Sequence, residues 1–159
     1  MKPVFSGRQF RALLLPITVD GVVPALILYT NQPVLAWPLP LRLGLAGLLS
    51  IGGGLWLLAQ TIRLLIVEGQ GTLAPWDPTR RLVVVGIYRR VRNTMITGVI
   101  VLLLGEAAVF ASPALLLWCL VAALINAVYI PLLEEPGLAE RFGADYEVYR
   151  RNVPLMRST

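Results

Sequence analysis

Residues 114–133 form the most apolar stretch of the chain; they carry no charged side chain, and the stretch ends abruptly at Glu134-Glu135-Pro136. At ~1.5 Å of rise per residue, a helix of this length crosses the ~30 Å hydrocarbon core of a bilayer. The stretch therefore predicts a membrane-spanning helix. Ionisable residues beside lipid are costly to place and mark functional sites. We expect the chemistry of the protein at this junction, within reach of both water and lipid.

The composition extends this prediction to the whole chain. Apolar residues make up 57% of the 159 residues and charged residues only 14%, which is typical of an integral membrane protein. The length suffices for one domain, residues 1–159, of four spanning helices. Ser112-Pro113 leaves almost no loop and predicts a tight helical hairpin, and Gly52-Gly53-Gly54 predicts close helix packing. The predicted fold class is all-α and polytopic, with spans at about 12–30, 41–67, 95–111 and 114–133.

The distribution of positive charge predicts the orientation in the membrane. Arginines gather after the second span and in the C-terminal tail, whereas the loop at 31–40 carries no charge. Because positively charged loops stay in the cytosol, we expect both termini and the loop at 68–94 on that side of a bacterial inner membrane. The net charge of +5 then reflects topology and attraction to anionic lipid, and no nucleic-acid partner is expected.

The reactive and ionisable side chains inside the spans are few. Histidine is absent and Cys119 is the single cysteine, so we expect no disulfide and no metal site. Asp20 and Arg63 lie at similar depths near one membrane face and are expected to pair. Glu106 and Asn126 lie on the two arms of the hairpin. They are expected to hydrogen-bond across it or, alternatively, to line a substrate cavity.

The loop after the second span carries a second group of candidate site residues. Residues 69–79 are turn-rich, and the apolar run Leu82–Tyr88 that follows has to be buried because it lies in water. Together with the two carboxylates after the fourth span, this loop offers backbone amides, an aromatic ring, an amide side chain and two acids at one membrane face. This set of groups suits a small polar cofactor.

Two ordered motifs carry a resemblance to a known family. The first is Leu82-Val83-x-x-Gly86-x-Tyr88-x-x-x-Arg92-Asn93-x-Met95-x-x-Gly98, and the second, after the hairpin, is Glu134-Glu135-x-x-Leu138-x-x-x-Phe142-Gly143-x-x-Tyr146-x-x-Tyr149-x-x-x-Val153-Pro154. Over about residues 69–154 the chain resembles the isoprenylcysteine carboxyl methyltransferases and their bacterial relatives, which include phospholipid methyltransferases. The resemblance implies a membrane enzyme that binds S-adenosylmethionine (SAM) in a pocket formed by the cytosolic loop and a C-terminal cytosolic helix.

The resemblance also implies roles for individual residues. The acceptor is a membrane lipid or a lipidated small molecule, methylated on a carboxylate or an amine. Glu134 becomes the catalytic residue, and Glu134 and Glu135 lie on the acceptor side. Glu135 lies ~100° further around a helix and is expected to tolerate replacement better. Methyl transfer from a sulfonium needs alignment and a dry pocket, so the lack of histidine is no objection. The implied cofactor contacts are Arg80, Arg81, Leu82, Val83, Tyr88, Asn93, Thr94, Met95 and Ile96.

The chain departs from the family pattern at two places. After the arginine, the family has His-Pro or Asn-Pro, then a small residue or Met, then Tyr, whereas this chain has Asn93-Thr94-Met95-Ile96. Without the proline the helix is free to begin earlier, and without the tyrosine a cofactor contact is missing. Ile130 replaces an arginine that eukaryotic members associate with the substrate carboxylate. Two alternatives stay open: a non-catalytic scaffold of the same fold, and a small four-helix transporter with Asp20 or Glu106 as its coupling carboxylate.

Overall fold

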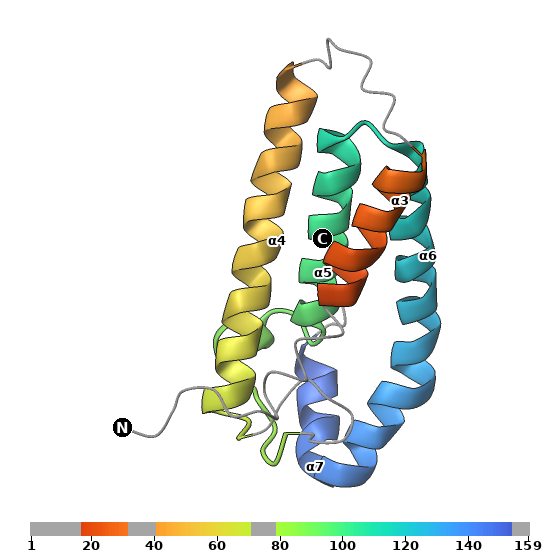
Figure 1. Ribbon diagram of the computed structural model, residues 1–159. Helices are drawn as coiled ribbons and strands as arrows, with labels where there is room; N and C mark the ends of the chain where they lie inside the picture. The colour runs from red at the N-terminus through yellow and green to blue at the C-terminus, as the bar shows by residue number, and fades with distance from the viewer. Residues whose placement is uncertain (1–16, 32–40, 71–78, 154–159) are drawn as a thin grey trace.

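The computed structural model describes residues 17–31, 41–70 and 79–153, and within these ranges every regular element is helical (Figure 1). The predicted all-α class is therefore confirmed for the described part of the chain. Residues 12–16 of the first predicted span and residues 71–78 of the predicted cofactor loop lie outside it. The elements in chain order are η1 (Thr18–Val22), α3 (Val23–Asn31), α4 (Leu41–Val67), η2 (Gly86–Arg89), α5 (Thr94–Val109), α6 (Pro113–Tyr129), η3 (Ile130–Glu134) and α7 (Glu135–Asn152).

The long helices run antiparallel in a small bundle. α4 packs along α5, α5 and α6 form a hairpin, and α3 packs against α6 (Figure 1). α7 lies at the end of the bundle where α4 stops and α5 starts (Figure 1). The loop before α5 and the segment after α6 therefore meet at one end of the molecule, as the sequence predicts.

The boundaries of the second, third and fourth predicted spans agree closely with helices, and residues 18–30 of the first lie in η1 and α3. The second span coincides with α4, and the third and fourth differ from α5 and α6 by a few residues at their ends. Two helical segments, Leu41–Val67 and Pro113–Asn152, are long and apolar enough to cross a membrane, while Thr94–Val109 is a shorter apolar helix. A backbone in lipid must satisfy its own hydrogen bonds, which explains why such apolar stretches become helices.

The hairpin turn between α5 and α6 is confirmed as tight. Ala111 takes a left-handed conformation with φ of 46°. Ser112 caps α6, because its hydroxyl accepts a hydrogen bond from the Leu115 amide at 3.3 Å. Pro113 occupies the first turn of the helix, where its missing N–H leaves no intrahelical bond unmade.

Glycines allow the backbones of α4 and α5 to approach closely. A Cβ atom on Gly54 would lie 2.8 Å from the Cβ of Leu102, and one on Gly105 would lie 2.7 Å from the carbonyl oxygen of Gly47. Gly52 and Gly53 face open space. The predicted packing surface at residues 52–54 is therefore correct only for Gly54. Residues seven positions apart share one helix face, so Gly47 and Gly54 are the pair that faces α5.

Two predicted polar contacts inside the bundle are wrong. No ion pair joins Asp20 to Arg63, because η1 packs against α5 whereas Arg63 is exposed on α4. Asp20 instead lies close enough to Glu106 for their charges to interact. Asn126 donates to the carbonyl of Ala122 in its own helix at 2.8 Å and makes no bond across the hairpin to Glu106.

Buried side chains form two separate clusters. One lies between the long helices and includes Leu103 and Cys119. The other lies at the end of the bundle and joins Tyr146, Tyr149 and Val153 of the C-terminal segment to Leu82 of the loop. The predicted burial of the apolar run before α5 is thus confirmed in part: Val83 and Tyr88 are buried, whereas Val84 and Val85 are exposed.

We expect Gly54→Ala to lower the melting temperature of the detergent-solubilised protein. The added methyl group meets backbone and side-chain atoms of α5 at 2.8 Å, and such overpacking costs ~1–3 kcal/mol. Gly53→Ala is the matched control, because its added methyl group would have no neighbouring atom within 4 Å. That change should be neutral or stabilising by up to ~1 kcal/mol. Equal melting temperatures for the two variants would contradict the close helix contact.

Candidate functional site

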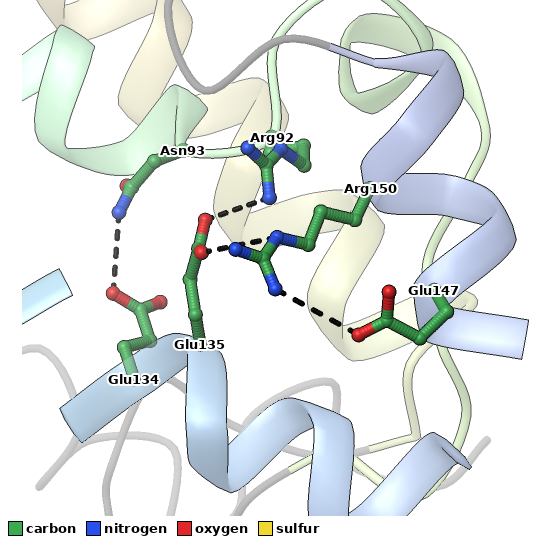
Figure 2. A network of polar contacts seen from close by, with 6 residues as sticks. All are labelled: Arg92, Asn93, Glu134, Glu135, Glu147 and Arg150. Atoms are coloured by element: carbon green, nitrogen blue, oxygen red, sulfur yellow. Dashed lines mark hydrogen bonds and ion pairs between the residues drawn. The ribbon is translucent and has the colours of Figure 1, made fainter. Parts of the chain in front are cut away.

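Asn93 lies at the start of α5 and uses both ends of its amide group. Its Oδ1 atom accepts a hydrogen bond from the Ile96 amide at 3.2 Å and so caps the helix. Its Nδ2 atom donates to Oε2 of Glu134 at 3.2 Å (Figure 2). Because the cap fixes the orientation of the amide, the N–H groups of this buried side chain point toward the carboxylate.

Glu134 ends a π-helical turn, Ile130–Glu134, that joins α6 to α7. Pro131 lies in this turn. A proline inside a helix lacks an amide donor and collides with the preceding turn, and a widened turn accommodates it. Single π-helical turns occur frequently at functional sites.

Gly143 then reverses the direction of the chain within α7. Its backbone has φ of 52° and ψ of −127°, a conformation that side chains other than glycine rarely adopt. The residues after the reversal return toward the start of α5. Arg150 consequently lies beside the carboxylate of Glu135, and Glu147 lies on the far side of Arg150 (Figure 2).

Glu135 is the centre of an ion-pair network. Its Oε1 atom lies 2.6 Å from Nη1 of Arg92, and its Oε2 atom lies 3.5 Å from Nε of Arg150. The side chains of Arg92 and Glu135 are only 13% and 11% exposed, so this pair is shielded from solvent. Arg150 also lies 3.7 Å from Glu147, and both of these side chains are about half exposed (Figure 2).

Two adjacent residues just before α5 therefore contact two adjacent residues where η3 meets α7. Arg92 pairs with Glu135, and Asn93 pairs with Glu134. The two sequence motifs that carry the family resemblance are thus in direct contact. The expectation that Glu135 tolerates replacement better than Glu134 takes no account of this network, in which Glu135 is the more buried and more heavily bonded carboxylate.

Glu134 has a different environment from its neighbour. The residue is exposed, and it follows the exposed side chains of Leu132 and Leu133. Protein atoms still crowd its carboxyl group, and this desolvation raises the pKa of Glu134. The Asn93 amide opposes the rise, and the negative charge of Glu135 adds to it. Glu134 is therefore an accessible carboxyl group that holds a proton more readily than an ordinary glutamate.

Tyrosines attach α7 to the loop before α5. The Tyr149 hydroxyl donates to the carbonyl oxygen of Tyr88 at 2.7 Å. The rings of Tyr146 and Tyr149 lie 6.3 Å apart in a tilted arrangement, and both side chains are buried. Burial raises the pKa of Tyr88 and Tyr149, so both hydroxyls stay protonated and can donate hydrogen bonds.

The other predicted cofactor residues fall in several places. The amides of Arg80 and Arg81 both donate to the Gly69 carbonyl just after α4, at 2.8 and 3.3 Å, and their side chains are exposed. Leu82 packs against the tyrosine cluster of α7. Met95 packs against the core between the helices instead.

The remaining members of the predicted set support the start of α5. Val83 is buried in the loop. Thr94 is buried and donates its hydroxyl hydrogen to the carbonyl of Val91 at 3.1 Å, while Ile96 supplies the amide that Asn93 caps. Among the described residues, no group of three or more His, Cys, Asp or Glu side chains could hold a metal ion.

The sequence does not predict Arg92 and Arg150 as members of the site, because their charge is interpreted only as a signal for membrane orientation. A usable signal is present for Arg92, since it precedes Asn93 directly just as Glu135 follows Glu134. No comparable pattern points to Arg150, whose position depends on the reversal at Gly143.

Within the described residues, the apolar helices and the polar site at one end of the bundle indicate a helical membrane protein with a candidate enzyme site. The phospholipid methyltransferase family matches residues 43–145, from the start of α4 to just beyond Gly143. The chain belongs to this family, which confirms the resemblance and groups it with methyltransferases rather than with transporters. Searches of curated proteins and of solved structures found no significant match.

We expect Glu135→Gln to destabilise the protein. The change removes the charge that pairs with Arg92 at 2.6 Å, and hydrogen bonds to charged groups contribute ~1.5–3 kcal/mol. Glu147→Gln is the control, because it weakens an exposed pair worth ~0–1 kcal/mol. Thermal unfolding of the two variants in the same detergent measures the difference. A melting temperature for Glu135→Gln as high as that of the control would show that the network does not stabilise the fold.

Proposed function

We propose that the chain is a SAM-dependent membrane methyltransferase that methylates a lipid acceptor at the end of the bundle where α7 lies. The observation that carries this proposal is the contact of Asn93 with Glu134 and of Arg92 with Glu135. These contacts join the two motifs of a methyltransferase family and leave one carboxyl group accessible beside exposed leucines. Phospholipid methyltransferases generally use SAM, which supports the choice of cofactor.

The residues at this end of the bundle fit such a cofactor. Within the described ranges, the two arginines nearest the carboxylates both pair with Glu135, so Glu134 has a neutral amide and no cation as its partner. A cationic acceptor, rather than the cofactor, is therefore the complementary ligand for Glu134. The exposed side chains of Arg80 and Arg81 can bind a carboxylate at the same end. When bound, SAM supplies a methyl group on a positively charged sulfur.

The electrostatics favour an amine over a carboxylate as the acceptor. A carboxylate acceptor would meet the like charge of Glu134. Ile130, at the position of the arginine that eukaryotic members associate with the substrate carboxylate, is apolar and buried. An amine approaches as an ammonium ion and is attracted. The ammonium nitrogen has no free electron pair, so it must lose one proton before it attacks the methyl carbon and the carbon–sulfur bond breaks to leave a neutral sulfide. Glu134 is placed to accept that proton, and its raised pKa suits the task.

The full topology belongs to the same proposal. The predicted span at 12–30, which includes η1 and α3, and the helices α4, α5 and α6 form the four spans of this proposal, with the arginine-rich loop, α7 and both termini in the cytosol of a bacterial cell. The acceptor, a membrane lipid or a lipidated small molecule, then reaches Glu134 from the bilayer past Leu132 and Leu133. The water-soluble cofactor reaches the same carboxyl group from the cytosol.

We expect Glu134→Gln to retain SAM affinity and to lower methyl transfer by ~100-fold or more, the range for a lost positioned acid or base. Glutamine can still accept the hydrogen bond from Asn93, so the geometry is kept. The measurement is single-turnover methylation of a bacterial lipid extract with tritiated SAM. Glu140→Gln, on the exposed surface of α7, is the control and should be unaffected. Equal rates for both variants would remove Glu134 from the mechanism, and an unmodified protein that labels no lipid would favour the scaffold.

We expect two variants of Asn93 to weaken SAM binding, measured by calorimetric titration. Asn93→Leu removes both the helix cap and the amide donor. Asn93→Ser retains a capping side chain and removes only the donor to Glu134. The loss of SAM binding free energy in each variant should be ~1–3 kcal/mol, the cost of leaving buried groups of the cofactor unpaired. If Asn93→Ser binds SAM normally and only Asn93→Leu fails, Asn93 serves the helix and not the site.

A further inference from the structure

Thr61 on α4 is fully buried, with 0% of its surface exposed. Its hydroxyl has no hydrogen-bond partner within the described part of the chain. Threonine hydroxyls in helices commonly bond to the carbonyl about one turn earlier, and those of Thr30, Thr94 and Thr97 do so. Thr61 is different. Because an unpaired buried hydroxyl is unfavourable, its position calls for a partner from another element.

Tyr88 is the polar side chain beside Thr61. The short helix η2, which contains Tyr88, packs against α4, and the Tyr88 side chain is buried there. Burial raises the pKa of Tyr88, as do Tyr149 and the charge of Glu134, whereas the neighbouring Thr61 hydroxyl lowers it. Tyr88 is therefore close to Thr61 on one helix and to Glu134 of the candidate site.

We propose that Thr61 is a positioning residue of the site: its hydroxyl donates a hydrogen bond to the phenol oxygen of Tyr88 and holds that ring in place near Glu134. The Tyr149 hydroxyl already binds the carbonyl of Tyr88 at 2.7 Å. The main chain of Tyr88 is thus held by α7 and its side chain by α4. This role rests on the proposed function, because the Tyr88 ring has a cofactor to contact only if the protein binds SAM.

The kinetic test compares Thr61→Val with Thr61→Ser. Valine has the shape of threonine without the hydroxyl, and it should raise the KM for SAM roughly three- to tenfold, the effect of one neutral hydrogen bond, with kcat retained. Serine restores the hydroxyl and should restore the KM. Tyr88→Phe should raise the KM by a similar factor, and the double variant Thr61→Val with Tyr88→Phe should be no worse than either alone. An unchanged KM in Thr61→Val overturns the proposal.

Thermal unfolding of the same four variants tests the contact without any need for activity. If Thr61 and Tyr88 are bonded, the two single changes lower the melting temperature and the double change adds nothing further. If the Thr61 hydroxyl has no partner, Thr61→Val raises the melting temperature and the effects add, which overturns the proposal. An unmodified protein that transfers no methyl group refutes the proposed function, while the unfolding comparison still decides whether Thr61 holds Tyr88.

Discussion

The shielded ion pair between Arg92 and Glu135 is the interaction on which the arrangement of the site depends. It joins the start of α5 to the start of α7 at 2.6 Å, in surroundings where few water molecules can screen it. Each partner is bonded covalently to a residue of the second contact. The contact of Arg92 with Glu135 therefore also brings Asn93 to Glu134. The position of the accessible Glu134 carboxyl group thus depends on an ion pair that is itself shielded from solvent.

The fold places these four residues through two glycine-dependent features. Close packing of α4 on α5 requires the missing side chains of Gly54 and Gly105, and it sets the position where α5 begins. The left-handed backbone at Gly143 returns the chain so that Arg150 reaches Glu135 and Tyr149 reaches Tyr88. The first feature lies in the apolar bundle and the second lies at its end, so the packing of the helices and the return of α7 to the site depend on different parts of the chain.

Much of the helical framework could be predicted from the sequence, because apolar length alone determines where a helix crosses lipid. The limits of α4 and the hairpin at Ser112 follow from that rule. The partners inside the bundle could not be predicted in this way. The position of a residue in the sequence gives its depth in a helix but not the neighbouring helix that its side chain faces. The sequence therefore predicts a pair between Asp20 and Arg63, and it does not reveal that Asp20 lies near Glu106. For the same reason it counts Arg92 as a topology signal and not as a partner of Glu135.

The departure from the family pattern at residue 94 has little structural consequence. A proline at this position would start the helix by its fixed backbone angle. Here Asn93 caps the helix and the Thr94 hydroxyl bonds to Val91, and α5 begins at Thr94, where the proline would have begun it. The argument for a non-catalytic scaffold therefore loses its support from Thr94. It depends on Ile96 alone, which supplies its amide to the cap but offers a cofactor no aromatic ring.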